Sequence, residues 1–277
     1  MSVIGTNIGA MRASNASASA NASLQQAMER LSTGKRINSA KDDAAGMAIV
    51  SSMTSQIKGM SQAVRNANDG ISLAQTAEGA LGEVTNMMQR IRELSVQASS
   101  ETYSDDDRTN LNTEVGELTK QINSVLSSTK FNGVALFNNT ATATAAADNF
   151  DIQVGAAKGD TVTVPKVQID ATNLSATGLD VTTVAKAGTT LDNIDAGLKA
   201  VNKARATLGA SQSRLTSAVN NLTSNVENLS SARSAIEDTD YSVETQALAK
   251  AQILSQASTA MLAQANQSQQ GVLELLR

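Results

Sequence analysis

The sequence predicts a mainly α-helical protein: an elongated antiparallel bundle of long helices (a coiled-coil rod), with paired N- and C-terminal helices and a small β-rich lobe. Apolar residues repeat at alternating spacings of four and three over residues 194–236, which is typical of a coiled-coil seam. Similar stripes follow residues 64–98 and 111–125. At about 1.5 Å per residue, a helix over 194–236 is roughly 65 Å long, so other helices must cover its stripe.

The composition favours long helices over a large globular core. Aromatic residues make up 2% of the 277 residues, and tryptophan is absent. The net charge of −4 argues against a nucleic-acid-binding protein, which usually needs a basic surface. Cysteine and histidine are both absent, which excludes thiol and imidazole catalysis and zinc sites of these residues. We therefore expect no enzyme, no cofactor and no metal site.

The N-terminal residues 1–11 lack the basic and apolar regions of a cleaved signal peptide. No apolar run approaches the roughly 18 residues that indicate a membrane span. We expect no membrane insertion, and we expect any export from the cell to use a route that does not read such a signal.

Residues 2–31 carry three charges and a weak apolar helical face. This face has too little apolar surface to fold alone. It indicates either a disordered tail or a helix that becomes ordered only against another subunit. Its apolar positions are Ile4, Ile8, Met11, Leu24, Ala27, Met28 and Leu31.

Gly34 is expected to end this first helix. Ser39 and Asp42 then predict a capping box at the start of the next helix. The Gly-Lys pair at this point is also found in phosphate-binding loops, but the earlier glycine and the following Ser or Thr of such loops are missing. The pair is therefore interpreted as a helix end.

The stripe over residues 64–98 is the expected cover for the 194–236 seam, and a third helix is expected through 111–125. Ser104 and the three aspartates after it predict the start of that third helix. A calcium loop at 101–108 is the alternative, but its acids are consecutive and the glycine of an EF-hand is missing.

The predicted seam of the rod contains apolar and polar positions. Arg205, Gln212 and Arg233 are polar, and they are expected to pair with acids on facing helices or to reach a neighbouring subunit. The apolar positions are Leu198, Val201, Leu208, Leu215, Val219, Leu222, Val226 and Leu229.

A β-rich region follows the third helix. An Asn-Gly pair between apolar residues at 131–137 predicts a hairpin. Alternating apolar residues at 150–154 and 162–169 predict short strands joined by a turn at 155–160. We expect residues 138–190 to form a short outward-facing lobe that contains no acid/base pair.

Residues 242–277 are weakly charged and amphipathic, like the N-terminal tail. Two such tails at one end of the rod would complete a core only when many copies converge, which favours a helical polymer. Their expected polymerisation residues are Leu248, Leu254, Met261, Leu262, Leu273 and Leu276, with Ile4, Ile8, Leu24, Met28 and Leu31 of the first segment.

Several motifs resemble those of bacterial flagellin. Residues 31–49, LSTGKRINSAKDDAAGMAI, closely resemble its N-terminal signature. The resemblance covers roughly residues 1–137 and 190–277, and the middle is shorter than in long flagellins, so their large outer domains are expected to be absent. The further matching segments are AQIL at 251–254, AQAN at 263–266, VLELLR at 272–277, QRIRELSVQ at 89–97 and FNGV at 131–134.

The resemblance implies an extracellular structural subunit that polymerises with itself into the flagellar filament for swimming motility. It implies that residues 1–39 and 237–277 form the inner tube, and that residues 40–137 and 191–236 form the rod. The 138–190 lobe would lie on that rod. A hook–filament junction protein and a surface adhesin of the same fold are the alternatives, although low aromatic content argues against sugar stacking by an adhesin.

The resemblance also implies partners. These are the flagellar type III export apparatus with a dedicated chaperone on the C-terminal tail, the filament cap and hook-associated proteins, other flagellins, and the vertebrate flagellin-sensing Toll-like receptor. The expected receptor contacts are Gln89, Arg90, Leu94 and Glu114.

Overall fold

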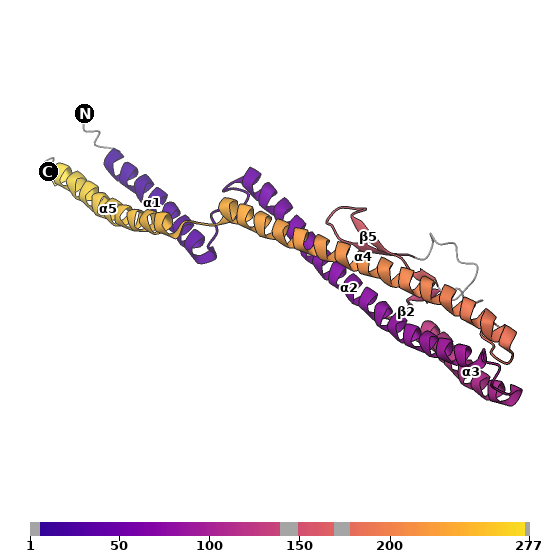
Figure 1. The fold of residues 1–277 in the computed structure, drawn as a ribbon. Coiled ribbons are helices and arrows are strands. Elements are labelled where there is room, and N and C mark those ends of the chain that lie inside the picture. The colour runs from indigo at the N-terminus through magenta and orange to yellow at the C-terminus, as the bar shows by residue number, and fades with distance from the viewer. Residues whose placement is uncertain (1–5, 139–148, 169–177, 275–277) are drawn as a thin grey trace. The chain divides into compact units, whose positions relative to one another are not determined.

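The computed structural model describes residues 6–138, 149–168 and 178–274, with side chains up to residue 271 (Figure 1). The chain divides into two compact units. The terminal unit consists of residues 1–57 and 227–277, and the rod unit consists of residues 58–226. Helices α2 (Ala44–Ala98) and α4 (Val184–Glu237) contribute to both units.

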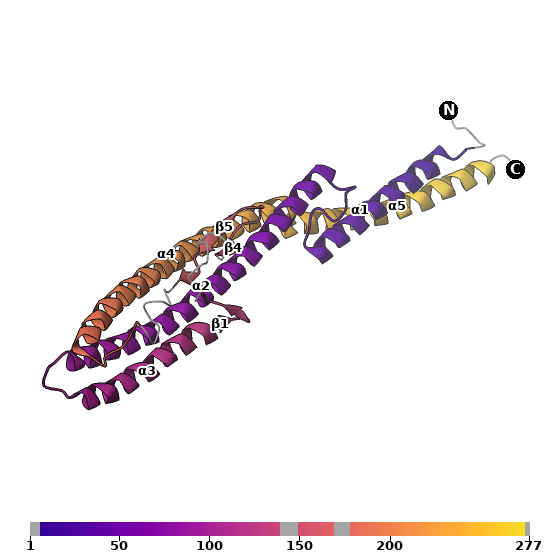
Figure 2. The same cartoon turned by 90° about the vertical axis from the view of Figure 1, so that its right-hand side faces the viewer.

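Two helices pair side by side in the terminal unit. These are α1 (Ile8–Thr33) and α5 (Tyr241–Glu274), and both views show them together (Figures 1 and 2). The Asn7 amide donates to the Ala265 carbonyl at 3.1 Å, and Arg30 pairs with Glu244 at 3.7 Å, so the helices are antiparallel. The first segment is therefore a helix, and its partner in this structure is α5 of the same chain.

The ends of α1 are capped at both sides. The Asn7 side chain accepts a hydrogen bond from the Ala10 amide at 2.9 Å. Gly34 has a φ of 71°, a left-handed conformation that glycine adopts at little cost, and its N–H donates to the Arg30 carbonyl. The predicted helix end at Gly34 is confirmed.

The predicted start of α2 was wrong by several residues. The Ser39 hydroxyl and amide do donate to the Asp42 carboxylate, but they close a turn that precedes the helix. The Asp43 carboxylate caps α2 instead, accepting from the Gly46 amide at 2.8 Å. Asp43 caps the helix because its carboxylate oxygen reaches the free N–H groups in the first turn of α2. The Asp42 carboxylate already accepts hydrogen bonds from Ser39.

The segment after Gly34 is hydrogen-bonded to the segment between α4 and α5. Lys35 and Asp238 form an antiparallel bridge, and the Arg36 amide donates to the Glu237 carbonyl at 2.6 Å. The Lys35 ammonium lies 2.5 Å from the Glu237 carboxylate. These contacts join the segment between α1 and α2 to the segment between α4 and α5 within the terminal unit.

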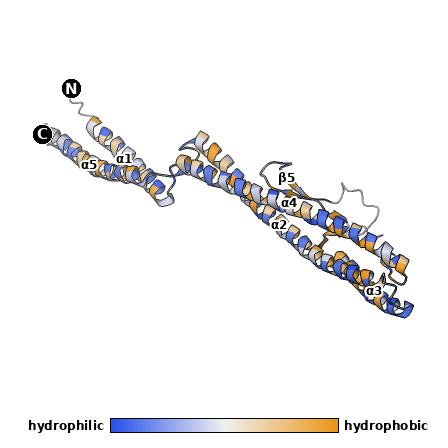
Figure 3. Ribbon diagram, viewed as in Figure 1, coloured by the Kyte–Doolittle hydropathy of each residue, from blue (hydrophilic) through white to orange (hydrophobic). Residues whose placement is uncertain are grey.

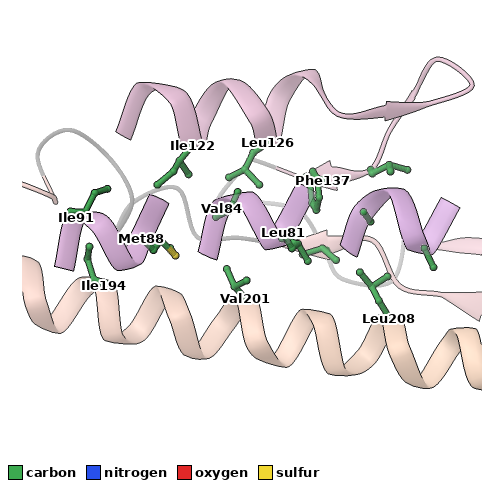
Figure 4. Packing of buried hydrophobic residues seen from close by; sticks show 14 of the residues in the cluster. Leu81, Val84, Met88, Ile91, Ile122, Leu126, Phe137, Ile194, Val201 and Leu208 are labelled. Atoms are coloured by element: carbon green, nitrogen blue, oxygen red, sulfur yellow. The ribbon is translucent and has the colours of Figure 1, made fainter. Parts of the chain in front are cut away.

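In the rod unit, α2 lies between α3 (Asp105–Ser128) and α4 (Figure 4). Ile122 and Leu126 approach α2 from α3, while Ile194, Val201 and Leu208 approach it from α4. Most of the buried residues of α2 form two rows, each with a period of seven. These rows are Met60, Ala67, Ala74, Leu81 and Met88, and Ala63, Gly70, Ala77, Val84, Ile91 and Ala98.

Part of the predicted seam of α4 is buried in the structure. Val201, Leu208, Leu215 and Leu222 are buried, together with Ala187 and Ile194, at intervals of seven residues. The second row was predicted one position too late. It consists of the small residues Thr190, Gly197 and Ser211, while Leu198, Val219, Val226 and Leu229 are half-buried. Small side chains let the backbones of the two helices approach closely. The predicted row, one position further along α4, therefore lies at the edge of the interface.

This edge position explains the polar residues in the predicted seam. Arg205 lies 3.8 Å from one oxygen of Glu78, and the Gln212 amide donates to the other oxygen at 3.1 Å. Arg233 pairs with Glu237 on its own helix at 3.9 Å. All three side chains are half-buried, so their polar ends remain partly hydrated. A fully buried seam position would not accommodate such polar groups.

Ser104 caps α3, as predicted. Its hydroxyl accepts from the Asp107 amide, and the Asp107 carboxylate accepts from the Ser104 side chain and backbone, completing a capping box. The Ser104 side-chain hydrogen bond, followed by the Ser104 backbone bond, lowers the pKa of Asp107. The buried Arg108 donates to the carbonyls of Ala98 and Ser100, so it closes the end of α2.

The β region contains three two-stranded ladders. β1 (Lys130–Phe131) and β2 (Val134–Ala135) form the predicted antiparallel hairpin, with Asn132 and Gly133 in left-handed conformations at its turn. β4 (Phe150–Gln153) and β5 (Thr161–Val164) are antiparallel, as the alternation predicted. β3 (Phe137–Asn138) and β6 (Val167–Gln168) pair in parallel.

The predicted outward-facing lobe over 138–190 needs two corrections. Its last residues belong to α4, which begins at Val184. Its strands are also part of the core, since Val162, Val164 and Val167 are buried against the helices. Valines that alternate along a strand need an apolar partner surface, and α2 and α4 provide it. Residue 169, the end of the predicted strand at 162–169, lies outside the described residues.

The predicted fold class, mainly α with paired terminal helices and a small β region, is confirmed. Within the described ranges, no helix combines the length and the apolar character needed to cross a membrane.

Candidate assembly surface

Small residues form the contact between α1 and α5. Ala13, Ala20 and Ala27 are the buried residues of α1. Opposite them, Glu244, Ala251 and Ser258 are buried on α5. Both sets repeat every seven residues, so each helix turns the same narrow edge toward the other. This interface is completed without large apolar side chains.

The large apolar side chains of both helices lie on the outside of this pair. Met11 on α1 is 59% exposed, and Met261 and Ile253 on α5 are 62% and 66% exposed. Figure 3 shows hydrophobic residues interspersed with hydrophilic ones along both helices. Several large apolar residues in one small unit mark a surface that another molecule covers.

The predicted polymerisation residues fall into three groups. Ile8, Met28, Leu254 and Met261 are exposed. Leu24, Leu31, Leu248 and Leu262 are half-buried along the edges of the helix pair. Ile4, the side chain of Leu273, and Leu276 lie outside the described residues.

An open groove runs between α1 and α5 on this surface. Its volume is about 550 Å³, and Met261 and Arg12 lie at its border. The groove exists because alanines and glycines on both helices leave room between the larger side chains. Its lining residues are Gly9, Arg12, Ala13, Ala16, Ala257, Ser258, Met261, Gln264, Ala265 and Ser268.

Sequence reasoning missed part of this surface. Ile253, Val243 and Tyr241 are exposed on α5, outside the single stripe predicted for that helix. The period of seven in Ala13, Ala20 and Ala27 was the signal that could have separated the inner edge from the outer face. Alanine is too common in this chain for that period to stand out by hydropathy alone.

The expected receptor contacts lie on α2 and α3 of the rod unit. Gln89, Arg90 and Glu114 are exposed, and the Arg90 guanidinium lies 2.9 Å from the Glu114 carboxylate. The hydrogen bond to Glu114, followed by the bond to Glu93, raises the pKa of Arg90. Leu94 does not belong to this surface, because only 2% of it is exposed. It packs in the core, as its place in the helical stripe requires.

Two family models match the chain. The bacterial flagellin N-terminal helical region matches residues 4–142, and the bacterial flagellin C-terminal helical region matches residues 191–276. The chain belongs to the bacterial flagellin family. The first match ends in the β region after α3, and the second begins within α4, so both ends of this flagellin contain the family's helices.

Curated relatives match along nearly the whole chain. The flagellin of Halalkalibacterium halodurans is 45% identical over 255 residues, covering 91% of this chain and 92% of that protein. The flagellin of Bacillus subtilis is 43% identical and covers 99% of both chains. A flagellar filament 33 kDa core protein of Treponema phagedenis is 41% identical, covering 99% of this chain and 100% of that protein.

Solved structures agree with the fold. A crystal structure of Bacillus cereus flagellin has a TM-score of 0.50 and 33% identity, covering 61% of this chain and 94% of that chain. A flagellar hook-associated protein from Vibrio parahaemolyticus has a TM-score of 0.58 over 71% of this chain and 100% of that chain. The second has 18% identity, so the likeness shows a shared fold alone.

This flagellin is a structural subunit of the bacterial flagellar filament, and the predicted function is confirmed. The family consists of structural proteins that polymerise with themselves into an extracellular filament. The short middle of the chain, compared with long flagellins, lies between the two matched regions.

Proposed function

We propose that the exposed apolar residues of α1 and α5 are the surface through which this flagellin polymerises. The observation that carries the proposal is that different residues of the terminal unit form the contact between its helices and its exposed apolar surface. Small residues join α1 to α5, while Met11, Ile253 and Met261 remain exposed. Their burial in a neighbouring copy would contribute roughly 25 cal/mol per Å² of apolar surface removed from water.

A helical filament requires contacts that do not close into a ring. Two different patches on one subunit, each covered by the next copy, produce such an open assembly. The groove between α1 and α5 and the apolar side chains at its border offer complementary shapes for this contact. In this proposal, the terminal units form the inner tube and the role is structural, without catalysis.

Replacing Met261 by aspartate tests the proposal. The charge lies on an exposed side chain, so the helix pair should keep its melting temperature within a few degrees. Filament formation should be abolished, because assembly would bury an unpaired carboxylate. Negative-stain electron microscopy and sedimentation measure the filaments.

Gln256→Asp is the matched control, since Gln256 is an exposed polar residue of the same helix. It introduces the same residue with a similar loss of helix propensity. Normal filaments from Met261→Asp would contradict the proposal, and so would loss of filaments from both variants.

We also propose that the same terminal helices bind the flagellar export chaperone, and that the chain leaves the cell unfolded through the flagellar type III apparatus. The exposed apolar residues of α5, such as Leu254 and Met261, support this, because a chaperone must cover them before assembly. The filament cap and hook-associated proteins would contact the same unit at the filament ends. Removal of residues 242–277 should abolish co-purification of the chaperone.

A second candidate function is recognition by the vertebrate flagellin-sensing Toll-like receptor, and we propose that Gln89, Arg90 and Glu114 make the contact. Their support is that all three are exposed and come from neighbouring turns of α2 and α3. Arginine in such clusters often dominates binding energy. Leu94 would act only by supporting α2 from the core side.

Arg90→Ala should lower receptor activation by the monomer about tenfold or more, as loss of a dominant contact would. Reporter cells that express the receptor provide the measurement. Lys120→Ala is the control, because Lys120 lies exposed on α3 and pairs only within that helix, with Glu117. Equal activation by Arg90→Ala and the unmodified chain would contradict the assignment.

A further inference from the structure

The apolar interface between α2 and α4 repeats so regularly that it admits more than one alignment. The Cβ position of Gly70 lies 3.2 Å from the Leu215 side chain, so these residues face each other. Moving three steps of seven residues in opposite directions along the two helices places Ile91 opposite Ile194, as Figure 4 shows.

A shift of one heptad keeps apolar every layer that contains Ala187, Ile194, Val201, Leu208, Leu215 or Leu222. Ile91 would face Val201 or Ala187 in place of Ile194. Near the other end, Gly70 would face Leu208 or Leu222. All of these residues are buried and apolar in the present alignment or small enough to fit between the helices. Burial alone therefore discriminates weakly between alignments that differ by about 10.5 Å along the helix.

The connection between the helices also leaves the alignment open. A short loop between antiparallel helices would limit how far they can slide. Here residues 99–183 separate α2 from α4, and they include α3 and all the strands. The alignment must be specified by contacts between the helices and their neighbours.

Polar contacts join α2 to α4 at two points, and only the present alignment makes all of them. Glu78 accepts a hydrogen bond from Gln212 and pairs with Arg205, which are seven residues apart on α4. Fourteen residues further along α2, Arg92 donates to Asp195 at 3.0 Å. Both contacts join α2 to α4 at the edge of the apolar rows.

A slip by one heptad breaks the Arg92–Asp195 contact and one of the two Glu78 contacts. Arg92 would meet Gly188 or Asn202, and neither carries a charge. Glu78 would lie between Leu198 and Arg205, or between Gln212 and Val219, so it would lose one of its two partners to an aliphatic side chain. Polar residues beside a coiled-coil seam are known to specify alignment in this way.

We propose that Glu78 and Arg92 act together as a two-point register lock, which fixes the alignment of α4 against α2 within the rod unit. The lock contributes little attraction in absolute terms, because its side chains are half exposed. Its effect lies in the difference between alignments, since the competing ones separate Arg92 from Asp195 and leave Glu78 with one polar partner in place of two.

Cysteine cross-linking tests the lock, because the chain has no cysteine of its own. Thr85 and Asn202 lie one heptad from Arg92 and Asp195, so cysteines at these two positions report the present alignment. Cysteines at Thr85 and Gly209 report a slip by one heptad and leave Glu78, Arg92 and Asp195 in place. The full-length monomer is refolded, treated with a short bis-maleimide, and analysed by peptide mass spectrometry.

In the otherwise unmodified chain, the Thr85 and Asn202 positions should cross-link and the Thr85 and Gly209 positions should not. Adding Glu78→Ala and Arg92→Ala should raise the slipped cross-links about tenfold, the change for a difference of about 1.4 kcal/mol between alignments. Glu117→Ala with Lys120→Ala is the matched control, since that ion pair lies within α3. It should leave the cross-links unchanged.

A charge exchange keeps the test valid if the double alanine variant fails to fold. Arg92→Asp alone should produce slipped cross-links, and Asp195→Arg added to it should restore the present alignment. The lock is refuted if the variants without it cross-link only in the present alignment. It is also refuted if the unmodified lock already permits the slipped cross-links.

Discussion

At the scale of single residues, Gly70 decides how closely three elements pack. A Cβ at this position would lie 3.0 Å from Ile152 of β4 and 3.2 Å from Leu215 of α4. Both contacts are tighter than ordinary van der Waals contacts, and they approach from different elements. Gly70 therefore lets the strands and α4 meet on the same turn of α2.

Gly70→Ala should lower the melting temperature, although alanine is the better helix former. The gain of up to about 1 kcal/mol in helix propensity is outweighed by an overpacking cost of about 1–3 kcal/mol. Circular dichroism at 222 nm during heating provides the measurement. Gly79→Ala is the control, because nothing lies within 4 Å of its Cβ position, and it should stabilise α2 by about 0.5–1 kcal/mol. A rise in melting temperature for both variants would show that the Gly70 site can relax.

At the scale of elements, the long helices could be predicted because their hydropathy patterns are strong. The three-four spacing placed α2, α3 and α4, and Ser104 placed the start of α3. Which residues form the second row of α4 could not be predicted, since Thr190, Gly197 and Ser211 are not hydrophobic. They are buried because they are small, and hydropathy does not report size.

The same reason limited the prediction of the terminal helices. Their inner edge is made mostly of alanine and serine, while their large apolar residues are exposed or half-buried. If every apolar residue is assumed to be buried, the sequence identifies the large apolar residues of these helices correctly. It then predicts that they are buried within one subunit, although they are not. The Leu94 assignment failed for the opposite reason, because a matching motif says which residues are present and not which way each side chain points.

The start of α2 shows a third limit. Ser39, Asp42 and Asp43 all have side chains that cap helices, and the sequence alone does not rank them. The structure selects Asp43 because the preceding residues are held in turns by the Asn38 and Ser39 contacts to Asp42. These bonds, beginning with the Ser39 backbone bond, lower the pKa of Asp42.

At the scale of the whole molecule, we expect the rod unit to fold without the terminal helices and the terminal unit to be required for polymerisation. A chain without residues 2–31 and 242–277 should remain helical, because the core of the rod unit contains none of those residues. It should not polymerise, since it lacks α1 and nearly all of α5. Far-UV circular dichroism measures the first result, and electron microscopy after slow recovery from heating measures the second. Filaments of uniform width from this chain would contradict the proposed role of the terminal unit.

The hydrogen bond between Asn7 and Ala265 has a consequence for timing, because it joins residues 258 positions apart. A contact of such high sequence separation can form only after nearly the entire chain is available, and closing so large a loop is slow. Until then α1 has no inner partner, and the two-helix surface does not exist. A chain that stops before Ala265 cannot form this hydrogen bond, so it lacks part of the pairing between α1 and α5.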